Sequence, residues 1–252
     1  MRQFFPLRDL SKEPHNTILG YPRATKSQIQ TRVKELKKLG IDGIIFEGPM
    51  IINKICVLGK GYTGVVVLAK LGTKKVALKI RRTDSPRPDM KGETILLQTA
   101  NKAGAGPKLI ASSKNFLVME YLDGAKIYDW IKDLKGKGST ASLKNTIRKV
   151  LTDCYRLDSA GIDHGELSNI TKHVIVGKKI TLIDFESSSL ERKVSNVTSA
   201  CQAILIGSGI AKMVNRIYKL PPKQKIITVL RKYKELRTQK SFDDVLEALK
   251  LT

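Results

Sequence analysis

Two neighbouring stretches decide the fold of this chain: Leu58-Gly59-Lys60-Gly61-Tyr62-Thr63-Gly64-Val65 and Val76-Ala77-Leu78-Lys79-Ile80. The three glycines of the first stretch predict a tight loop whose backbone N–H groups can face phosphate groups. A run of valine and leucine follows Gly64, so we expect a strand there, and not the helix that a Rossmann dinucleotide-binding fingerprint requires. Short runs of Val, Ile and Leu between residues 50 and 80, separated by glycines, predict an antiparallel meander.

Two further features of the first half point to the same kind of site. Glu93 lies near the start of a helix expected over residues 91–103, where its carboxylate can pair with Lys79 and hold the ammonium against phosphate oxygens. Farther along, the segment Val118-Met119-Glu120-Tyr121-Leu122-Asp123-Gly124 is expected to be extended, with backbone groups available to the edge of an adenine ring. Together these patterns predict a nucleotide site.

The second half of the chain is expected to be mainly helical, with two short polar motifs. These are His164-Gly165-Glu166-Leu167 and Ile183-Asp184-Phe185-Glu186. An aspartate that follows an apolar strand, as Asp184 does, is well placed to hold Mg²⁺. A strand-rich half thus precedes a helix-rich half, and this predicts an α+β plan with two lobes and a cleft at their crossover.

Taken in order, the glycine loop, VALK, a helix glutamate, MEYLDG, HGEL and IDFE resemble the protein-kinase-like superfamily. The HG pair and the short C-terminal part are similar to the atypical RIO kinases, to the small kinase of the tRNA-modifying KEOPS complex, and to archaeal proteins predicted as serine/threonine protein kinases. The resemblance covers roughly residues 50–190. It implies a two-lobed kinase-like fold, with an N-terminal helix–strand extension over 1–49, a strand-rich N-lobe over 50–122 and a reduced helical C-lobe over 123–252.

The resemblance also implies an activity, its cofactors and its site residues. The activity is ATP-dependent phosphoryl transfer or ATP hydrolysis with Mg²⁺ or Mn²⁺, in which Lys79 and Glu166 are catalytic. The nucleotide is expected at Leu58, Gly59, Gly61, Gly64, Val65, Ala77, Lys79, Glu93, Met119, Glu120 and Leu122. The metal is expected at Asp184, with Asn169 and His173 as further candidate ligands.

The chain departs from the family pattern around the catalytic loop. Glu166 stands where the family has aspartate, Thr171 stands where it has asparagine, and Glu186 replaces the glycine after Asp184-Phe185. Two other functions therefore stay open. The first is a nucleotide-binding pseudokinase that serves as an RNA-associated binding module. The second is a small-molecule kinase similar to the aminoglycoside and choline kinases, although a strongly basic chain suits their cationic substrates poorly.

Charge gives the second functional signal. The 252 residues contain 46 Lys and Arg against 23 Asp and Glu, a formal net charge of +23, and such an excess favours polyanionic partners. Residues 211–240 hold ten of these cations and one acid, Glu235; the ten are Lys212, Arg216, Lys219, Lys223, Lys225, Arg231, Lys232, Lys234, Arg237 and Lys240. We expect this face to bind RNA or a ribosomal particle, with a protein or RNA-associated phosphate acceptor. A smaller basic cluster is expected over Arg23–Lys38.

Composition restricts the classes of protein to which the chain can belong. Ordinary globular composition, no apolar run of the ~18 residues that a membrane span needs, and no signal-peptide pattern predict a cytoplasmic protein. Cys56, Cys154 and Cys201 are odd in number and lack CxxC spacing, so buried free thiols are expected instead of a disulfide framework or a zinc site.

Overall fold

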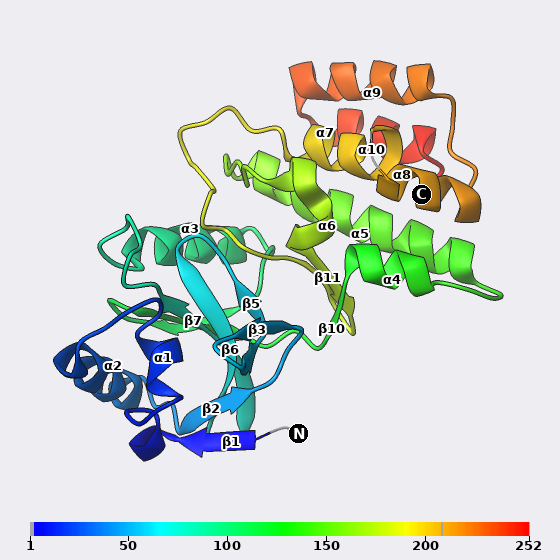
Figure 1. Cartoon of the computed structure of the whole chain (residues 1–252). Coiled ribbons are helices and arrows are strands. Elements are labelled where there is room, and N and C mark those ends of the chain that lie inside the picture. The colour runs from blue at the N-terminus through cyan, green and yellow to red at the C-terminus, as the bar shows by residue number, and fades with distance from the viewer. Residues whose placement is uncertain (1–2, 208, 252) are drawn as a thin grey trace. The chain divides into compact units, whose positions relative to one another are not determined.

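The computed structural model describes residues 3–207 and 209–251 as a mixed α+β structure with antiparallel sheets (Figure 1), which confirms the predicted α+β class. The chain divides into two compact units. Unit 1 comprises Met1–Ile95 with Pro107–Tyr121, and unit 2 comprises Leu96–Gly106 with Leu122–Thr252. The two units are described separately below.

Unit 1 is built on a seven-stranded antiparallel sheet in the order β1-β2-β6-β7-β9-β8, with β5 paired to β6. Its long central strands come from the two valine-rich stretches, because β-branched side chains favour a pleated, buried surface. The strands are β1(Gln3–Pro6), β2(Gly43–Phe46), β5(Gly59–Lys60), β6(Gly64–Leu71), β7(Lys74–Arg81), β8(Leu109–Ser112) and β9(Phe116–Glu120).

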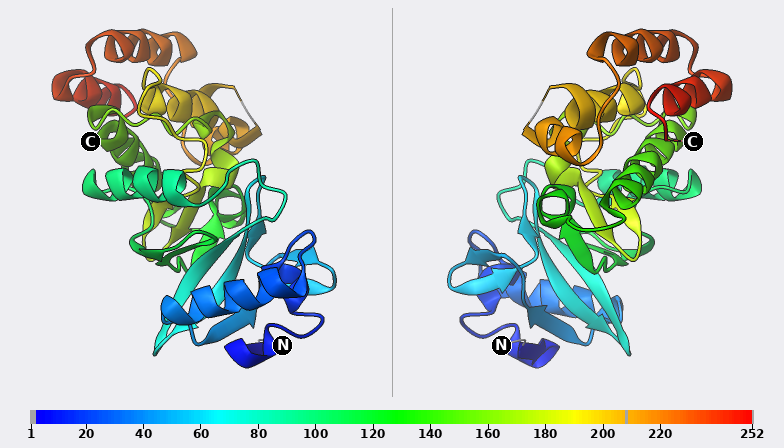
Figure 2. Two further views of the ribbon diagram at one scale, coloured as in Figure 1. Left: turned by 90° about the vertical axis from the view of Figure 1, so that its left-hand side faces the viewer. Right: turned by 90° about the vertical axis from the view of Figure 1, so that its right-hand side faces the viewer.

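Helix α2(Lys26–Lys38) packs against one face of this sheet (Figure 2). It begins at Thr25, whose side chain accepts a hydrogen bond from the Gln28 backbone while the Gln28 side chain caps Thr25 in return. Apolar residues at helical spacing, such as Ile29 and Leu36, join the core formed with the sheet. The short helices η1(Leu7–Asp9) and α1(Asn16–Leu19) complete the N-terminal part of this unit.

The N-terminal part of unit 1 joins its sheet, because β1 pairs with β2 along its whole length. The apolar run that begins at Met50 forms a hairpin of β3(Met50–Ile52) and β4(Ile55–Val57). Asn53 and Lys54 turn the chain there with φ values of 48° and 67°, the left-handed conformation of a tight hairpin turn.

A buried polar network also corrects the expected N-terminal basic cluster. Arg32 is only 3% exposed, and its guanidinium donates to the carbonyl of Leu19 and to Asn115 Oδ1. Burial lowers the pKa of Arg32 to about 10. Asn115 in turn donates from its backbone and its side chain to Glu35, both at 2.8 Å. Arg32 and Glu35 therefore fasten α2 to the sheet and do not belong to a basic surface.

Unit 2 is mainly helical and carries a three-stranded antiparallel sheet in the order β10-β11-β12. The 21-residue helix α5 buries Leu143, Ile147, Val150 and Leu157 along one face, as its apolar spacing dictates. The elements are α3(Lys91–Lys102), whose first turn belongs to unit 1, β10(Gly124–Lys126), α4(Ile127–Asp133), α5(Ser139–Ser159), η2(Leu167–Asn169), α6(Ile170–His173), β11(Val174–Gly177), β12(Ile180–Leu182), α7(Asn196–Cys201), the π-helical turn η3(Gln202–Ile206), α8(Gly209–Ile217), α9(Lys223–Leu236) and α10(Gln239–Ala248).

Within residues 3–207 and 209–251, no single helix is long and apolar enough to cross a membrane. One bent pair, Asn196–Ile206 with Gly209–Ile217, meets the requirements of length and composition. The three cysteines are free thiols. Cys154 and Cys201 are buried, as expected, and burial raises the pKa of both thiols, whereas Cys56 is only half-buried.

Candidate functional site

The Lys79 ammonium and the Glu93 carboxylate form a buried ion pair in unit 1. Lys79 Nζ donates to Glu93 Oε1 at 2.7 Å, and both side chains are about 5% exposed. Lys79 lies on β7, and Glu93 lies in the first turn of α3. The pairing expected from the sequence is therefore present, and it holds a desolvated ammonium in one position.

The period-two alternation of β7 decides which residues surround this pair. Val76, Leu78 and Ile80 point into the core packed by α2, so Ala77 and Lys79 lie on the opposite face of the sheet. Lys79 is opposite Val66 on β6 and Leu117 on β9, and Ala77 is opposite Met119. Ala77, Met119 and Lys79, all predicted site residues, thus share one face.

Val65 is the predicted nucleotide residue that lies on the other face. Its side chain is fully buried in the core that packs against α2. Alternation along β6 turns Val66, and not Val65, to the face of Lys79, so the Val65 side chain lies apart from the other predicted site residues of this sheet. Leu58 is half-buried, and its backbone N–H donates to the carbonyl of Val66 at 2.9 Å.

The glycine stretch forms a hairpin between β5 and β6, as predicted, and not a strand–helix turn. Gly61 closes the turn by donating from its N–H to the carbonyl of Gly64 at 2.8 Å. A Cβ atom on Gly64 would lie 3.0 Å from Cγ and Cε of Lys79, so glycine lets the aliphatic part of Lys79 pass directly over this backbone. A Cβ on Gly59 would meet nothing within 4 Å.

Side chains that sequence reasoning missed fix the tip of this hairpin. Arg82 donates to the carbonyl of Gly61 at 3.3 Å and is itself bound to Asp84 at 2.6 Å. Lys60 Nζ donates to Tyr21 Oη at 2.6 Å and lies over the Tyr21 ring. No local motif signals these contacts, because Tyr21 lies nearly forty residues before the hairpin in the chain.

The remaining predicted nucleotide residues lie around the end of β9. Glu120 closes the strand, and its N–H donates to the carbonyl of Lys108 at 2.8 Å. Leu122 is the first residue of the second part of unit 2 and is half-buried. The boundary between the two compact units thus falls between Tyr121 and Leu122.

In unit 2, two neighbours hold the carboxylate of Glu166. His173 Nε2 lies 2.9 Å from Glu166 Oε2, and the hydroxyl of Ser187 donates to Glu166 Oε1. His173 is 4% exposed, whereas the Glu166 side chain is 37% exposed. Sequence reasoning placed His173 beside a metal and missed Ser187 altogether. In the structure both residues contact the Glu166 carboxylate.

The backbone of Asp184 lies in the left-handed region, with φ at 70°. A non-glycine residue in the left-handed region is uncommon and strained, and such residues gather at active sites. Asn169 is exposed, and its Oδ1 accepts a hydrogen bond from Thr171 at 2.8 Å. Among the described residues, no group of three or more His, Cys, Asp or Glu side chains is arranged to hold a metal ion.

A buried network positions the loop that precedes Glu166. Asn196 Oδ1 accepts from the His164 backbone at 2.9 Å, and Asn196 Nδ2 donates to the carbonyl of Ile162 at 2.6 Å. Asp158 accepts from the backbone and the side chain of Asn196, from the Val197 backbone, and from the hydroxyl of Tyr233. The sequence pattern does not signal this network, whose members come from three separate helices and a loop.

His164 is fully buried below this loop. Its Nε2 donates to the carbonyl of Ile183 at 3.1 Å, and its Nδ1 is one of the buried atoms without a hydrogen-bond partner among the described residues. Burial, with a smaller contribution from His173, lowers the pKa of His164 to about 4, against the weaker attraction of Asp184 and Glu166. His164 is therefore a neutral packing residue, and its ring contacts Phe185 at 5.0 Å between centroids.

We expect His164→Gln to remove a pH dependence from the stability of unit 2. A buried histidine binds its proton more weakly in the folded than in the unfolded state, so the free energy of unfolding falls as the pH drops from 6.5 through about 4. The loss for the unchanged chain is about 3 kcal/mol below that range. Gln keeps a donor for the carbonyl of Ile183 but does not titrate, and Trp130 fluorescence during urea unfolding reports on unit 2.

The matched control is His15→Gln in unit 1, which makes the same substitution without touching unit 2. In this control variant the free energy of unfolding of unit 2, measured by Trp130 fluorescence, should keep its full dependence on pH. If the free energy of unfolding falls equally between pH 6.5 and 4 in His164→Gln and in the unchanged chain, His164 is not the neutral buried group.

Together the fold and the site define a mixed α+β protein with a buried lysine–glutamate pair beside a glycine hairpin, and with a glutamate held by a histidine and a serine on a second compact unit. No protein-family model matches the chain. The "Uncharacterized protein MJ1211" of the archaeon Methanocaldococcus jannaschii is 31% identical over 97 residues, which cover 38% of this chain and 79% of that protein. The chain belongs to the same family as this archaeal protein, whose name describes no activity.

Proposed function

We propose that the chain is an ATP-dependent phosphotransferase of the protein-kinase-like superfamily, an atypical RIO-like serine/threonine protein kinase or ATPase with a two-lobed fold. One observation carries the proposal: the buried Lys79–Glu93 pair lies beside a glycine hairpin whose Gly64 leaves room for the Lys79 side chain. An ammonium that is desolvated and fixed by a carboxylate is poised to bind the phosphates of a nucleotide.

Unit 1 would bind the nucleotide. The open backbone at Gly59 offers N–H groups to phosphate oxygens, and Lys79, held by Glu93, binds the α- and β-phosphates. Ala77 and Met119, on the same face of the sheet as Lys79, supply an apolar surface for the base. The end of β9 at Glu120 provides backbone groups for its edge.

Unit 2 would supply the groups for phosphoryl transfer. Asp184 holds Mg²⁺, an ion that protein sites bind through one or two carboxylates together with substrate phosphates, which agrees with the lack of a larger ligand cluster in the described chain. Bound Mg²⁺ neutralises the negative charge of the phosphates. Glu166 accepts the proton of the acceptor hydroxyl or of a water, since a carboxylate has about four acceptor positions and only two are engaged.

A second candidate function rests on the same carboxylate. Because His173 and Ser187 both hold Glu166, its carboxylate is less free to move toward a substrate, which favours a nucleotide-binding pseudokinase that acts as an RNA-associated module. The strong positive charge of the chain suits either function near RNA or ribosomes. A γ-phosphate transfer and ATP hydrolysis assay with Mg²⁺ or Mn²⁺, run with and without RNA, distinguishes the two.

We expect Glu166→Gln to lower turnover by about 10²-fold or more while nucleotide affinity stays the same, because only the proton-accepting group is lost. Gln retains the size of the side chain and an acceptor for Ser187. Turnover is measured by release of labelled phosphate, and affinity by calorimetry.

Ser187→Ala provides the comparison, because it removes a hydrogen bond from Glu166 and leaves the carboxylate more basic. Turnover in this variant should be equal to or above that of the unchanged chain. If Glu166→Gln turns over ATP normally, Glu166 is not the base; if the unchanged chain binds ATP but neither transfers nor hydrolyses it with any divalent ion, the pseudokinase function is the correct one.

A further inference from the structure

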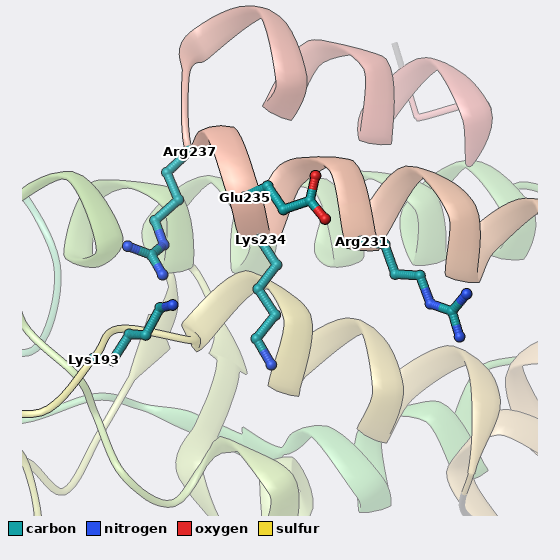
Figure 3. A pocket seen from close by; sticks show the side chains of 5 residues that line it. All are labelled: Lys193, Arg231, Lys234, Glu235 and Arg237. Atoms are coloured by element: carbon teal, nitrogen blue, oxygen red, sulfur yellow. The ribbon is translucent and has the colours of Figure 1, made fainter.

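Four cationic side chains of unit 2 line an open cavity of about 300 Å³ (Figure 3). Arg231 and Lys234 come from α9, Arg237 follows the last turn of that helix, and Lys193 comes from the segment before α7. The one acidic residue in the lining is Glu235. Two parts of the chain that are about forty residues apart therefore line the cavity together, and its lining is mostly positively charged.

The arrangement of the cations leaves hydrogen-bonding capacity unused. The head groups of Arg237 and Lys193 point toward each other, while Lys234 and Arg231 extend from the same side of α9 (Figure 3). Arg237 Nη2 is buried and has no hydrogen-bond partner among the described residues. A buried donor that lacks an acceptor is unfavourable, and converging like charges repel one another, so an anion in this cavity would relieve both.

Backbone geometry fixes Arg237 in place. The residue ends α9 with φ at 49°, and its N–H donates to the carbonyl of Tyr233 at 2.8 Å. Tyr233 is itself buried and bound to Asp158. The backbone of Arg237 is thus joined to the end of α9, one turn after a residue of the buried network of unit 2.

We propose that this cavity is a nucleic-acid site that binds phosphate groups of a single RNA strand. Guanidinium groups bind phosphate oxygens in a bidentate manner, and ammonium groups add point charges. No aromatic residue lines the cavity, so it offers no surface on which a base could stack, and recognition would depend on the backbone and not on sequence.

The surroundings of the cavity favour a polyanionic strand over a small anion. Exposed cations also occur on α8, α9 and α10 and in the segment between α8 and α9, and of these Lys232 is bound to Asp244. The others are Lys212, Arg216, Lys219, Lys223, Lys225 and Lys240. α9 alone is roughly 21 Å long at 1.5 Å per residue, enough for several consecutive phosphates of a strand. This inference does not depend on the proposed nucleotide site.

The test compares two fourfold variants with the same change in net charge. One replaces the cavity residues Lys193, Arg231, Lys234 and Arg237 by Gln; the other replaces Lys212, Lys219, Lys225 and Lys240 by Gln. Binding of a labelled single-stranded RNA of about 20 nucleotides is followed by fluorescence anisotropy between ~50 and ~200 mM salt, without ATP. Trp130 fluorescence and thermal melting establish that each variant is folded.

We expect the cavity variant to bind RNA about tenfold or more weakly than the control variant. If the cavity variant loses contacts with two phosphates, the slope of the logarithm of its binding constant against the logarithm of salt concentration should be less steep by ~1.4. Equal weakening in both variants, or no binding by the unchanged chain at ~50 mM salt, overturns the proposal. Should the cavity variant not fold, the single change Arg237→Gln against Lys240→Gln gives the same comparison.

A second arm uses inorganic phosphate alone and measures the melting temperature of unit 2. If phosphate stabilises the unchanged chain but not the cavity variant while RNA affinity is the same in both, the cavity takes a small anion and the RNA proposal is wrong. A loss of RNA affinity in the cavity variant with ATP turnover unchanged supports it and leaves the proposed function untouched.

Discussion

Replacing Lys79 by Met is expected to lower ATP turnover by about 10²–10³-fold, because a preorganised cation that stabilises transferring charge contributes on that scale. The same change leaves the Glu93 carboxylate buried without its ammonium partner, and breaking a buried pair in this way costs about 3–5 kcal/mol. Both the activity and the stability of unit 1 should therefore fall. Stability is measured by amide hydrogen exchange of β6 and β7.

The double variant Lys79→Met with Glu93→Gln separates the two effects. With neither charge present, most of the lost stability should return, since a buried pair replaced by neutral residues is often neutral for stability. ATP turnover should stay as low as in Lys79→Met. Recovery of turnover together with stability would mean that Lys79 acts only in folding and would remove the main support for the proposed nucleotide site.

Replacing Asp158 by Ala is expected to have the largest effect on the stability of unit 2. The carboxylate accepts four hydrogen bonds from Asn196, Val197 and Tyr233, at 2.8 to 3.2 Å. Each buried donor left unsatisfied costs about 1–3 kcal/mol, so a total loss of about 4 kcal/mol or more is expected. Urea unfolding followed by Trp130 fluorescence provides the measurement.

Two further variants test whether this loss of stability is specific to the network around Asp158. Tyr233→Phe removes one of the four donors and keeps the packing, so a loss of about 1 kcal/mol is expected. Asp243→Ala removes an exposed aspartate of α10 and should change the free energy of unfolding by less than about 0.5 kcal/mol. If Asp158→Ala is as mild as Asp243→Ala, the network around Asn196 does not hold the loop before Glu166.

The glycine hairpin and the Lys79–Glu93 pair could be predicted because they depend on short-range patterns. Glycine spacing sets the turn, the valine-rich run sets the strand, and a helix that begins near Glu93 brings its first turn to β7. The face on which Val65 lies could not be predicted in the same way. A one-residue step along a strand reverses the face of the sheet, and only the register of β6 with β7 shows that Val66 is the partner of Lys79.

The environment of Glu166 could not be predicted, for a different reason. Residue spacing suggested that His173 fills a metal-ligand position, whereas the fold turns its Nε2 to Glu166 and brings in Ser187 from a later loop. The environment of Arg32 in unit 1 could not be predicted either. Within a basic stretch it looks like a surface cation, but its contacts with Leu19 and Asn115 bury it.

By itself the sequence determined the α+β class, most helices and strands, and the lysine–glutamate pair, because local periodicity, turn residues and the order of motifs carry that information. Only the tertiary structure decided which polar residues lie together: Asp158 with Asn196 and Tyr233 in a buried network, and Lys193 with Arg237 around an open cationic cavity. These groups come from distant segments, and their positions follow from how helices pack after the chain has folded. No local pattern of residues specifies such a contact in advance.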